Sequence, residues 1–135
     1  MVCVQCGTKT QVINTRPQVK LNQQWRRRQC LGCKSTFSTI EVADYGALWA
    51  VKTPSKPLAP FNRDKLLLSL HRSIQHRPNA LKDASGLVDT VISKLQAVAS
   101  DGYMTNKQII QTVQVALNRF DKVGSVHYQA FHASN

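Results

Sequence analysis

The sequence of 135 residues contains few acidic residues, few aromatic residues and no long apolar run. Only seven residues are Asp or Glu, against 18 Lys or Arg, so the formal net charge is +11. Because no run of 18 apolar residues occurs, we expect no membrane-spanning helix and no membrane partner. The shortage of negative charge indicates a polyanionic partner, and the length allows one domain or two small ones.

Cysteine is absent beyond residue 33, and all four cysteines lie in two Cys-x-x-Cys pairs, Cys3/Cys6 and Cys30/Cys33. Four thiolates in two such pairs are the ligand set of a tetrahedral structural zinc site, so we predict zinc at these residues. Rubredoxin-like iron is the main alternative, because iron also accepts four thiolates. Two disulfides would suit a secreted chain, but no apolar signal segment opens the sequence, and a redox site needs only one pair. We therefore expect a cytoplasmic protein with reduced thiols.

The segment between the cysteine pairs is expected to form the strands of a small zinc ribbon. Residues 11–14 and 36–42 have strand-like patterns, and Arg16-Pro17 is expected to turn the chain. Few apolar residues are available for a core within residues 1–44, chiefly Val12, Ile13, Val19, Leu21, Phe37 and Ile40. Such a core is too small to fold unaided, so metal binding is expected to supply on the order of 10 kcal/mol.

A run of three arginines, Arg26, Arg27 and Arg28, lies directly before the second cysteine pair. Residues 1–44 carry seven Lys or Arg and two acids, whereas residues 45–135 carry eleven and five, so positive charge is denser in the first part. Basic side chains on a metal-braced element are typical of nucleic-acid binding. A lone arginine run can also be a merely solvated surface, but this one adjoins the metal site.

From residue 45 onward the sequence predicts a mainly helical domain with a short β-hairpin at its start. Residues 47–53 form a strand-like apolar run, and residues 54–60 are a proline-dense connection. We expect four helices: from Asn62 to about His76, through residues 81–98, from a Thr105/Gln108 capping box to Phe120, and after Asp121. Their apolar stripes include Leu66, Leu67, Leu70, Ile74, Leu81, Val88, Val91, Ile92, Leu95, Val98, Val113, Leu117, Val123, Val126 and Ala130. The predicted fold class is α+β, with domains 1–44 and 45–135.

No constellation of catalytic residues is visible in the second part. It contains no Gly-rich phosphate loop, no His-Glu-x-x-His helix and no Gly-x-Ser-x-Gly elbow, and its five acids are scattered. The four histidines lack ligand spacing and are expected at surface or boundary positions. We therefore expect no enzyme. An ATP-hydrolysing or reductase-associated enzyme would need a base, a nucleophile or magnesium carboxylates.

Cations gather around the expected start of the first helix: Lys52, Lys56, Arg63 and Lys65. Lysines at such a place can meet a phosphate group that also uses the positive end of the helix dipole. Unpaired lysines around a helix start are otherwise simply solvated.

Several motifs in this order closely resemble one protein family. They are Cys-x-x-Cys-Gly, Val-Ile-Asn-Thr-Arg at 12–16, Arg-Arg-Arg-Gln-Cys-Leu-Gly-Cys at 26–33, Phe-Ser-Thr-Ile-Glu at 37–41, Pro-Phe-Asn-Arg-Asp-Lys-Leu at 60–66 and Asp-Lys-Val-Gly at 121–124. Together they resemble the NrdR family, bacterial repressors of ribonucleotide reductase genes, over essentially the whole chain.

The resemblance implies a zinc ribbon that binds double-stranded operator DNA and an ATP-cone that senses ATP and dATP by changing its self-association. Cys3, Cys6, Cys30 and Cys33 would hold zinc, and Arg26, Arg27, Arg28 and Arg16 would contact DNA. The nucleotide pocket would involve Val51, Lys52, Lys65 and Tyr128, with Lys56 in the adjoining loop. A repressor of this kind is expected in the bacterial cytoplasm, at the nucleoid.

The alternative is a constitutive zinc-ribbon nucleic-acid-binding protein. Its ATP-cone would be degenerate, would sense no nucleotide and would serve oligomerisation. The proline-dense segment 54–60, which departs from the family pattern, favours this alternative.

Overall fold

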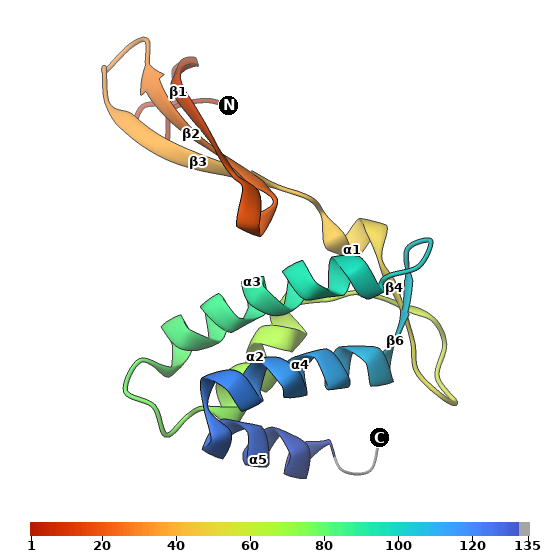
Figure 1. Cartoon of the computed structure of the whole chain (residues 1–135). Coiled ribbons are helices and arrows are strands. Elements are labelled where there is room, and N and C mark those ends of the chain that lie inside the picture. Colours follow the sequence, from red (N-terminus) through yellow and green to blue (C-terminus); the bar gives the residue numbers. More distant parts are fainter. Residues whose placement is uncertain (133–135) are drawn as a thin grey trace. The chain divides into compact units, whose positions relative to one another are not determined.

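A computed structural model of the chain describes residues 1–132, and the chain divides into two compact units, Met1–Ala43 and Asp44–Asn135 (Figure 1). Residues 133–135 of the predicted second domain lie outside the described residues. Within residues 1–132, no helix is both long enough and apolar enough to cross a lipid bilayer.

The first unit is a three-stranded antiparallel sheet with β2 (Gln23–Cys30) between β1 (Thr10–Gln18) and β3 (Thr36–Val42). The predicted turn at Arg16-Pro17 is wrong, because β1 continues through both residues. β1 is an edge strand, so the missing N–H of Pro17 is tolerated there. The chain turns instead at a short 3-10 helix, η1 (Val19–Leu21), which Asn22 ends in the left-handed conformation with φ of 50°.

The few apolar residues available for a core in this unit do not form one. Val19 is 83% exposed and Ile40 is 56% exposed, and most of the other apolar residues expected inside are exposed as well. The buried residues are Cys3, Thr10 and Cys30. A single-layer sheet has no second layer within its own unit to cover its faces, so burial concentrates where the two cysteine pairs meet.

The second unit confirms the mixed α+β class and contains more strands than predicted. Its elements are α1 (Tyr45–Leu48), β4 (Ala50–Lys52), β5 (Ala59–Pro60), α2 (Arg63–Ser73), α3 (Ala80–Val98), β6 (Tyr103–Thr105), α4 (Asn106–Phe120) and α5 (Lys122–Phe131). β4 pairs antiparallel with β5, as in the expected hairpin, and parallel with β6, which the sequence did not reveal. The strand-like run 47–53 is therefore only partly a strand, since its first residues belong to α1.

Four helices form the body of this unit. α2 packs against α3 and α5, and α4 packs against the same two helices, so each helix touches two others (Figure 1). Asn62 caps α2, and the capping box of Thr105 and Gln108 opens α4, as predicted. α2 ends at Ser73 rather than His76. The fully buried side chains between the helices include Leu70, Ile74, Val88, Val91, Leu95, Val113 and Leu117.

Two predictions of the buried face are wrong. Leu81 is 63% exposed, and on α5 the expected residues Val123, Val126 and Ala130 are exposed, whereas Gly124, Ser125 and Tyr128 are buried. The reason lies at Gly124, where a Cβ atom would stand 2.7 Å from Cγ2 of Ile74. Close approach of α5 to the end of α2 therefore requires Gly124, rather than Val123 or Val126, to face α2.

Candidate functional site

The four cysteines converge at one end of the ribbon although two of them lie 24 or more residues from the others. Their Sγ atoms all lie within 4.8 Å of one another, with Cys3 to Cys33 at 3.7 Å and Cys6 to Cys30 at 3.4 Å. A tetrahedral zinc ion with four thiolates holds its sulfur atoms about 3.8 Å apart. The cluster therefore fits zinc, and its separations are too long for disulfides, whose sulfur atoms lie about 2.05 Å apart.

The two cysteine knuckles are built alike. In each, the first cysteine donates its N–H to the carbonyl five residues later, Cys3 to Thr8 at 2.8 Å and Cys30 to Ser35 at 2.9 Å. The same two residues place hydroxyls beside the second cysteines, Thr8 Oγ1 3.3 Å from Cys6 Sγ and Ser35 Oγ 3.0 Å from Cys33 Sγ. In both knuckles, a hydroxyl group therefore contacts the thiol of the second cysteine.

The surroundings act in opposite directions on two of these thiols. Hydrogen bonds from the Ser35 hydroxyl, and then from backbone N–H groups, lower the pKa of Cys3 to about 6. Burial raises the pKa of Cys30. Metal binding requires thiolates, so the hydrogen bonds to Cys3 favour the form that a cation needs, while burial of Cys30 disfavours its charged form until a cation is present.

Register places the predicted DNA-contacting arginines on different faces of the sheet. Side chains alternate along a strand, and residues paired across strands share a face. Trp25 pairs with Arg16 and Ile40, and Arg27 pairs with Asn14 and Ser38. We call this the Trp25 face; its residues include Asn14, Arg16, Trp25, Arg27 and Ser38.

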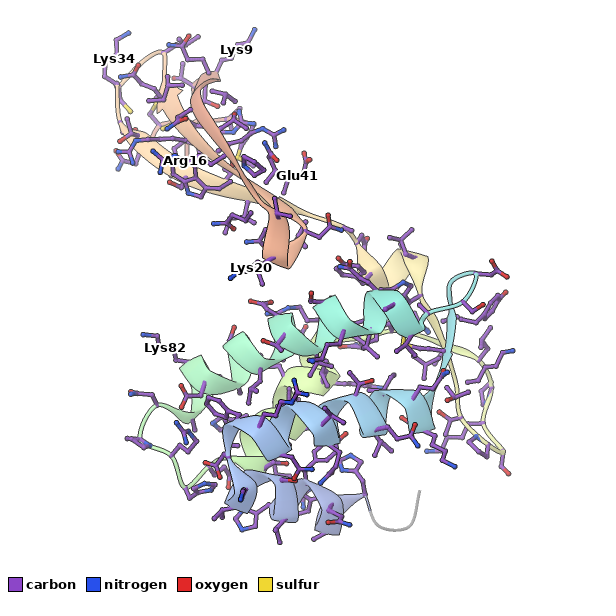
Figure 2. All side chains as sticks on the ribbon, in the orientation of Figure 1. Lys9, Arg16, Lys20, Lys34, Glu41 and Lys82 are labelled. Carbon is purple, nitrogen blue, oxygen red and sulfur yellow. The ribbon has the colours of Figure 1, made fainter. Side chains whose placement is uncertain are left out.

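The other two arginines, Arg26 and Arg28, lie on the opposite face, which we call the Arg26 face; its other residues include Phe37, Thr39 and Glu41. Arg26 forms an ion pair with Glu41 at 3.2 Å, and Arg28 donates to Thr10 Oγ1 at 3.4 Å. Figure 2 shows that positive charge also marks the two ends of the ribbon, with Lys9 and Lys34 at the cysteine end and Lys20 at the other. The run Arg26 to Arg28 is thus not a single patch.

The second unit contains a pocket of about 250 Å³ between the short sheet and the ends of three helices. Of the five residues predicted to bind nucleotide, Val51, Lys65 and Tyr128 line it. Further lining residues are Thr53, Ala59, Pro60, Phe61, Asn62, Leu66, Ser69, Asn106, Ile109, Ile110 and His132. Asn62 and Asn106 stand at the starts of α2 and α4, so two positive helix ends meet at the pocket.

Lys52 and Lys56 are not among the lining residues. Val51 and Lys52 are neighbours in β4 and therefore point to opposite faces of the strand. Lys52 Nζ instead lies 5.1 Å from the centre of the Tyr103 ring. Lys56 lies in the turn between Thr53 and Ala59, both of which line the pocket.

Tyr128 closes the inner side of the pocket. It is only 2% exposed, and burial raises the pKa of its hydroxyl to about 12, so the hydroxyl stays protonated at neutral pH. The ring of His132 stacks on that of Tyr128 with 4.1 Å between centroids. His132 Nδ1 lies 2.9 Å from the Tyr128 carbonyl oxygen, and this contact orients the imidazole in the pocket wall.

His71 lies in the last turn of α2 and His76 follows that helix, whereas His127 lies within α5 and His132 caps its end. Within residues 1–132 the cysteine cluster is the only group of His, Cys, Asp or Glu side chains arranged for a metal ion. His76 Nε2 lies 3.0 Å from Asp121 Oδ2, and the His127 ring stands edge-on to that of His76. These contacts join the end of α2 to α5, which is a structural role.

Comparison with known proteins gives matches over both units. Residues 1–41 match the family model described as "Transcriptional repressor NrdR-like, N-terminal domain". The chain is 31% identical to the transcriptional repressor NrdR of Pelotomaculum thermopropionicum over 133 residues, which cover 98% of this chain and 79% of that protein. It is 30% identical to the transcriptional repressor NrdR of Afipia carboxidovorans, covering 98% and 83%.

The chain belongs to the NrdR family of transcriptional repressors. As an NrdR zinc ribbon with four clustered cysteines, the first unit is suited to zinc.

Sequence reasoning missed several residues of the NrdR-like sites. Thr8 and Ser35 could have been identified from the sequence, because a hydroxyl residue stands at the same position after each cysteine pair, in Cys-x-x-Cys-x-Thr and Cys-x-x-Cys-x-Ser. Asn106 and His132 could not have been identified in this way, because they line the pocket together with residues that are far from them in the sequence. The split of the arginines between two faces could have been read from strand alternation, had β2 been predicted as a strand.

Proposed function

We propose that this NrdR family member is a nucleotide-responsive repressor that binds double-stranded operator DNA upstream of ribonucleotide reductase genes. Its second unit senses ATP or dATP, and occupancy changes the self-association of the chain. Linkage supplies the mechanism: the nucleotide that favours an assembly able to reach two operator boxes raises DNA affinity through effective concentration. The site of action is the cytoplasmic chromosome.

The observation that carries this proposal is the pocket. A lysine from the first turn of α2, the starts of two helices and a buried tyrosine converge on it. An ammonium group and two positive helix ends suit a phosphate chain, while Val51, Ile109 and Ile110 offer apolar surface to a base or sugar. In this proposal Lys65 contacts a phosphate group directly. Lys52 and Lys56, which do not line the pocket, contribute positive charge near it.

The DNA-binding half rests on the ribbon. Residues 1–43 contain seven Lys or Arg and a single acid, Glu41, so the first unit is strongly positive. The four-cysteine site holds the ends of the strands that carry Arg16 and the run Arg26 to Arg28. A rigid basic sheet of this kind suits a phosphate backbone. In this proposal the residues that contact DNA come from Arg16, Arg26, Arg27 and Arg28, and the face of the sheet that meets the duplex decides which of them do so.

The experiment combines two titrations of the zinc-loaded full chain. Isothermal titration calorimetry with ATP and with dATP measures nucleotide binding. Fluorescence anisotropy with a duplex from a reductase promoter measures DNA binding in the presence of each nucleotide, and light scattering follows the mass of the assembly. We expect both nucleotides to bind and one of them to strengthen DNA binding as the mass changes. Absence of binding at millimolar nucleotide would refute the sensing role.

A second candidate is a constitutive DNA-binding repressor whose second unit serves only self-association. The observation in its favour is that two of the predicted phosphate-binding lysines, Lys52 and Lys56, do not line the pocket. In that case DNA affinity and assembly mass would be the same with ATP, with dATP and without nucleotide.

A further inference from the structure

The two faces of the ribbon sheet differ in how much of their positive charge is already engaged. On the Arg26 face, the guanidinium of Arg26 is paired with Glu41, and its side chain is only 29% exposed. Arg28 is half-buried, donates to Thr10, and has a buried Nε without a hydrogen-bond partner within the described residues. Both cations on this face are therefore partly withdrawn from solvent.

The Trp25 face is open by comparison. Arg16 and Arg27 are exposed, and so are Asn14 and Ser38, which flank Arg27 on the neighbouring strands. Arg27 Nη2 donates to the hydroxyl of Thr36 at 3.0 Å, a neutral partner that orients the guanidinium without cancelling its charge. Glu41, the one acid of residues 1–43, pairs with Gln24 in the sheet and so lies on the opposite face. A polyanion on the Trp25 face would meet no carboxylate of the sheet.

Trp25 adjoins both exposed arginines of this face, because it pairs with Arg16 on β1 and lies two residues from Arg27 on β2. Its indole is half-buried, and the guanidinium carbon of Arg16 lies 5.8 Å from the centre of the ring. A cation held over an aromatic ring is pre-oriented at low entropic cost, while its outward N–H groups stay available to a phosphate. The flat indole beside it offers an apolar surface of the kind that packs against a sugar or a base edge.

We propose that the Trp25 face is the surface that contacts duplex DNA. Arg16 and Arg27 bind phosphates, and the Trp25 indole packs on the deoxyribose between them. Arg26 and Arg28 instead maintain the sheet from its other side. Charge complementarity selects the partner, because this face combines exposed guanidinium groups with an absence of acids. The inference rests on the proposed DNA-binding function and assigns it to one side of one sheet.

The test uses the zinc-loaded full chain and fluorescein-labelled duplex from a reductase promoter, with a scrambled duplex of the same length. Arg16→Gln and Arg27→Gln are compared with Arg26→Gln, a charge-matched change on the opposite face of the same sheet. We expect the first two to weaken DNA binding about tenfold each, as for a lost hydrogen bond to a charged group. Each should also reduce the slope of log K against log salt by about 0.9. Arg26→Gln should change neither quantity by more than a small factor.

A second readout does not depend on arginine variants folding. The indole N–H signals of Trp25 and Trp49 in a ¹H–¹⁵N spectrum are assigned with Trp25→Phe and followed as DNA is added. We expect the Trp25 signal to move, and an unmoved signal at saturating DNA would overturn the inference. So would a loss in Arg26→Gln equal to that in Arg27→Gln. If the wild-type chain binds neither duplex, the proposed function itself fails; if it binds and the faces do not differ, only the assignment of the face fails.

Discussion

Arg77 and Asp121 form a hydrogen-bonded ion pair in which Arg77 Nη1 donates to Asp121 Oδ2 over 2.9 Å. The same guanidinium donates through Nε to Asp83 Oδ2 at 2.8 Å, and Asp121 Oδ1 accepts the N–H of Gly124 at 2.9 Å. Arg77 thus joins the chain after α2 to the first turn of α3 and to the junction of α4 and α5. Asp121 is at once an ion-pair partner and the N-cap of α5.

Replacing Asp121 separates these two roles. Asp121→Ala removes the cap and the ion pair, and loss of such a cap alone costs about 0.5–2 kcal/mol. Asp121→Asn keeps an oxygen able to cap α5 but loses the charge, so it should be less destabilising. Urea unfolding of the full chain, followed by Trp49 fluorescence in a Trp25→Phe background, measures both. A stability for Asp121→Ala equal to that of the parent chain would contradict the assignment.

The same carboxyl predicts a pH dependence. Hydrogen bonds from the Gly124 N–H and the Arg77 guanidinium hold the pKa of Asp121 well below its usual range, so the folded chain resists protonation of this group more than the unfolded chain does. Its contribution to stability is therefore complete above the ordinary aspartate pKa near 4 and is lost as the pH falls below about 4. The urea midpoint of the parent chain should drop more steeply below pH 4 than that of Asp121→Asn. Parallel declines would exclude Asp121 as the source.

Two glycines in helices should respond to alanine with opposite signs. At Gly124 a Cβ would lie 2.7 Å from Cγ2 of Ile74, so Gly124→Ala should overpack the contact of α5 with α2 and cost about 1–3 kcal/mol. At Gly86, within α3, a Cβ meets no atom within 4 Å, so Gly86→Ala should stabilise by about 0.5–1 kcal/mol. Thermal unfolding measures the stability of both variants relative to the parent chain. A stabilising effect of Gly124→Ala would contradict the close contact between α5 and Ile74.

The hydroxyl of Ser35 should tune metal affinity. It lies 3.4 Å from Cys3 Sγ and 3.0 Å from Cys33 Sγ, so it is an outer partner of two proposed zinc ligands. Ser35→Ala should keep the zinc stoichiometry and weaken affinity at least about tenfold. Ser38→Ala, at an exposed serine of β3 three residues further along the chain, is the control. Competition with a chromogenic chelator gives both affinities, and equal values would remove Ser35 from the metal environment.

Replacing Lys65 should weaken nucleotide binding more than replacing a lysine outside the pocket. If it meets a phosphate of the bound nucleotide, Lys65→Gln should weaken ATP binding about tenfold or more, as for a hydrogen bond to a charged group. Lys82→Gln, an exposed lysine in the first turn of α3, should leave binding unchanged (Figure 2). Calorimetry with ATP compares the variants. The same loss in both would indicate a general effect of net charge rather than a specific contact.

Local patterns predicted the features that depend on a few neighbouring residues. Asn62 accepts the N–H of Lys65, and Thr105 and Gln108 form their reciprocal cap, because each of these bonds spans only three residues. The two cysteine pairs were likewise visible. Strand β6 was not, since three residues after a turn acquire strand geometry only by pairing with β4 across the unit.

The sequence by itself determined the ligand set of the metal site, the excess of positive charge and the helical nature of the second unit, because residue type and short-range spacing carry that information. Only the tertiary structure decided which surfaces these residues occupy. Strand register places Arg26 and Arg28 on one face of the sheet and Arg27 on the other. Close packing at Gly124 determines which face of α5 is buried. Strand alternation directs the side chain of Val51, and not that of Lys52, toward the pocket. Each outcome depends on contacts between segments distant in sequence, whose energies no local pattern contains.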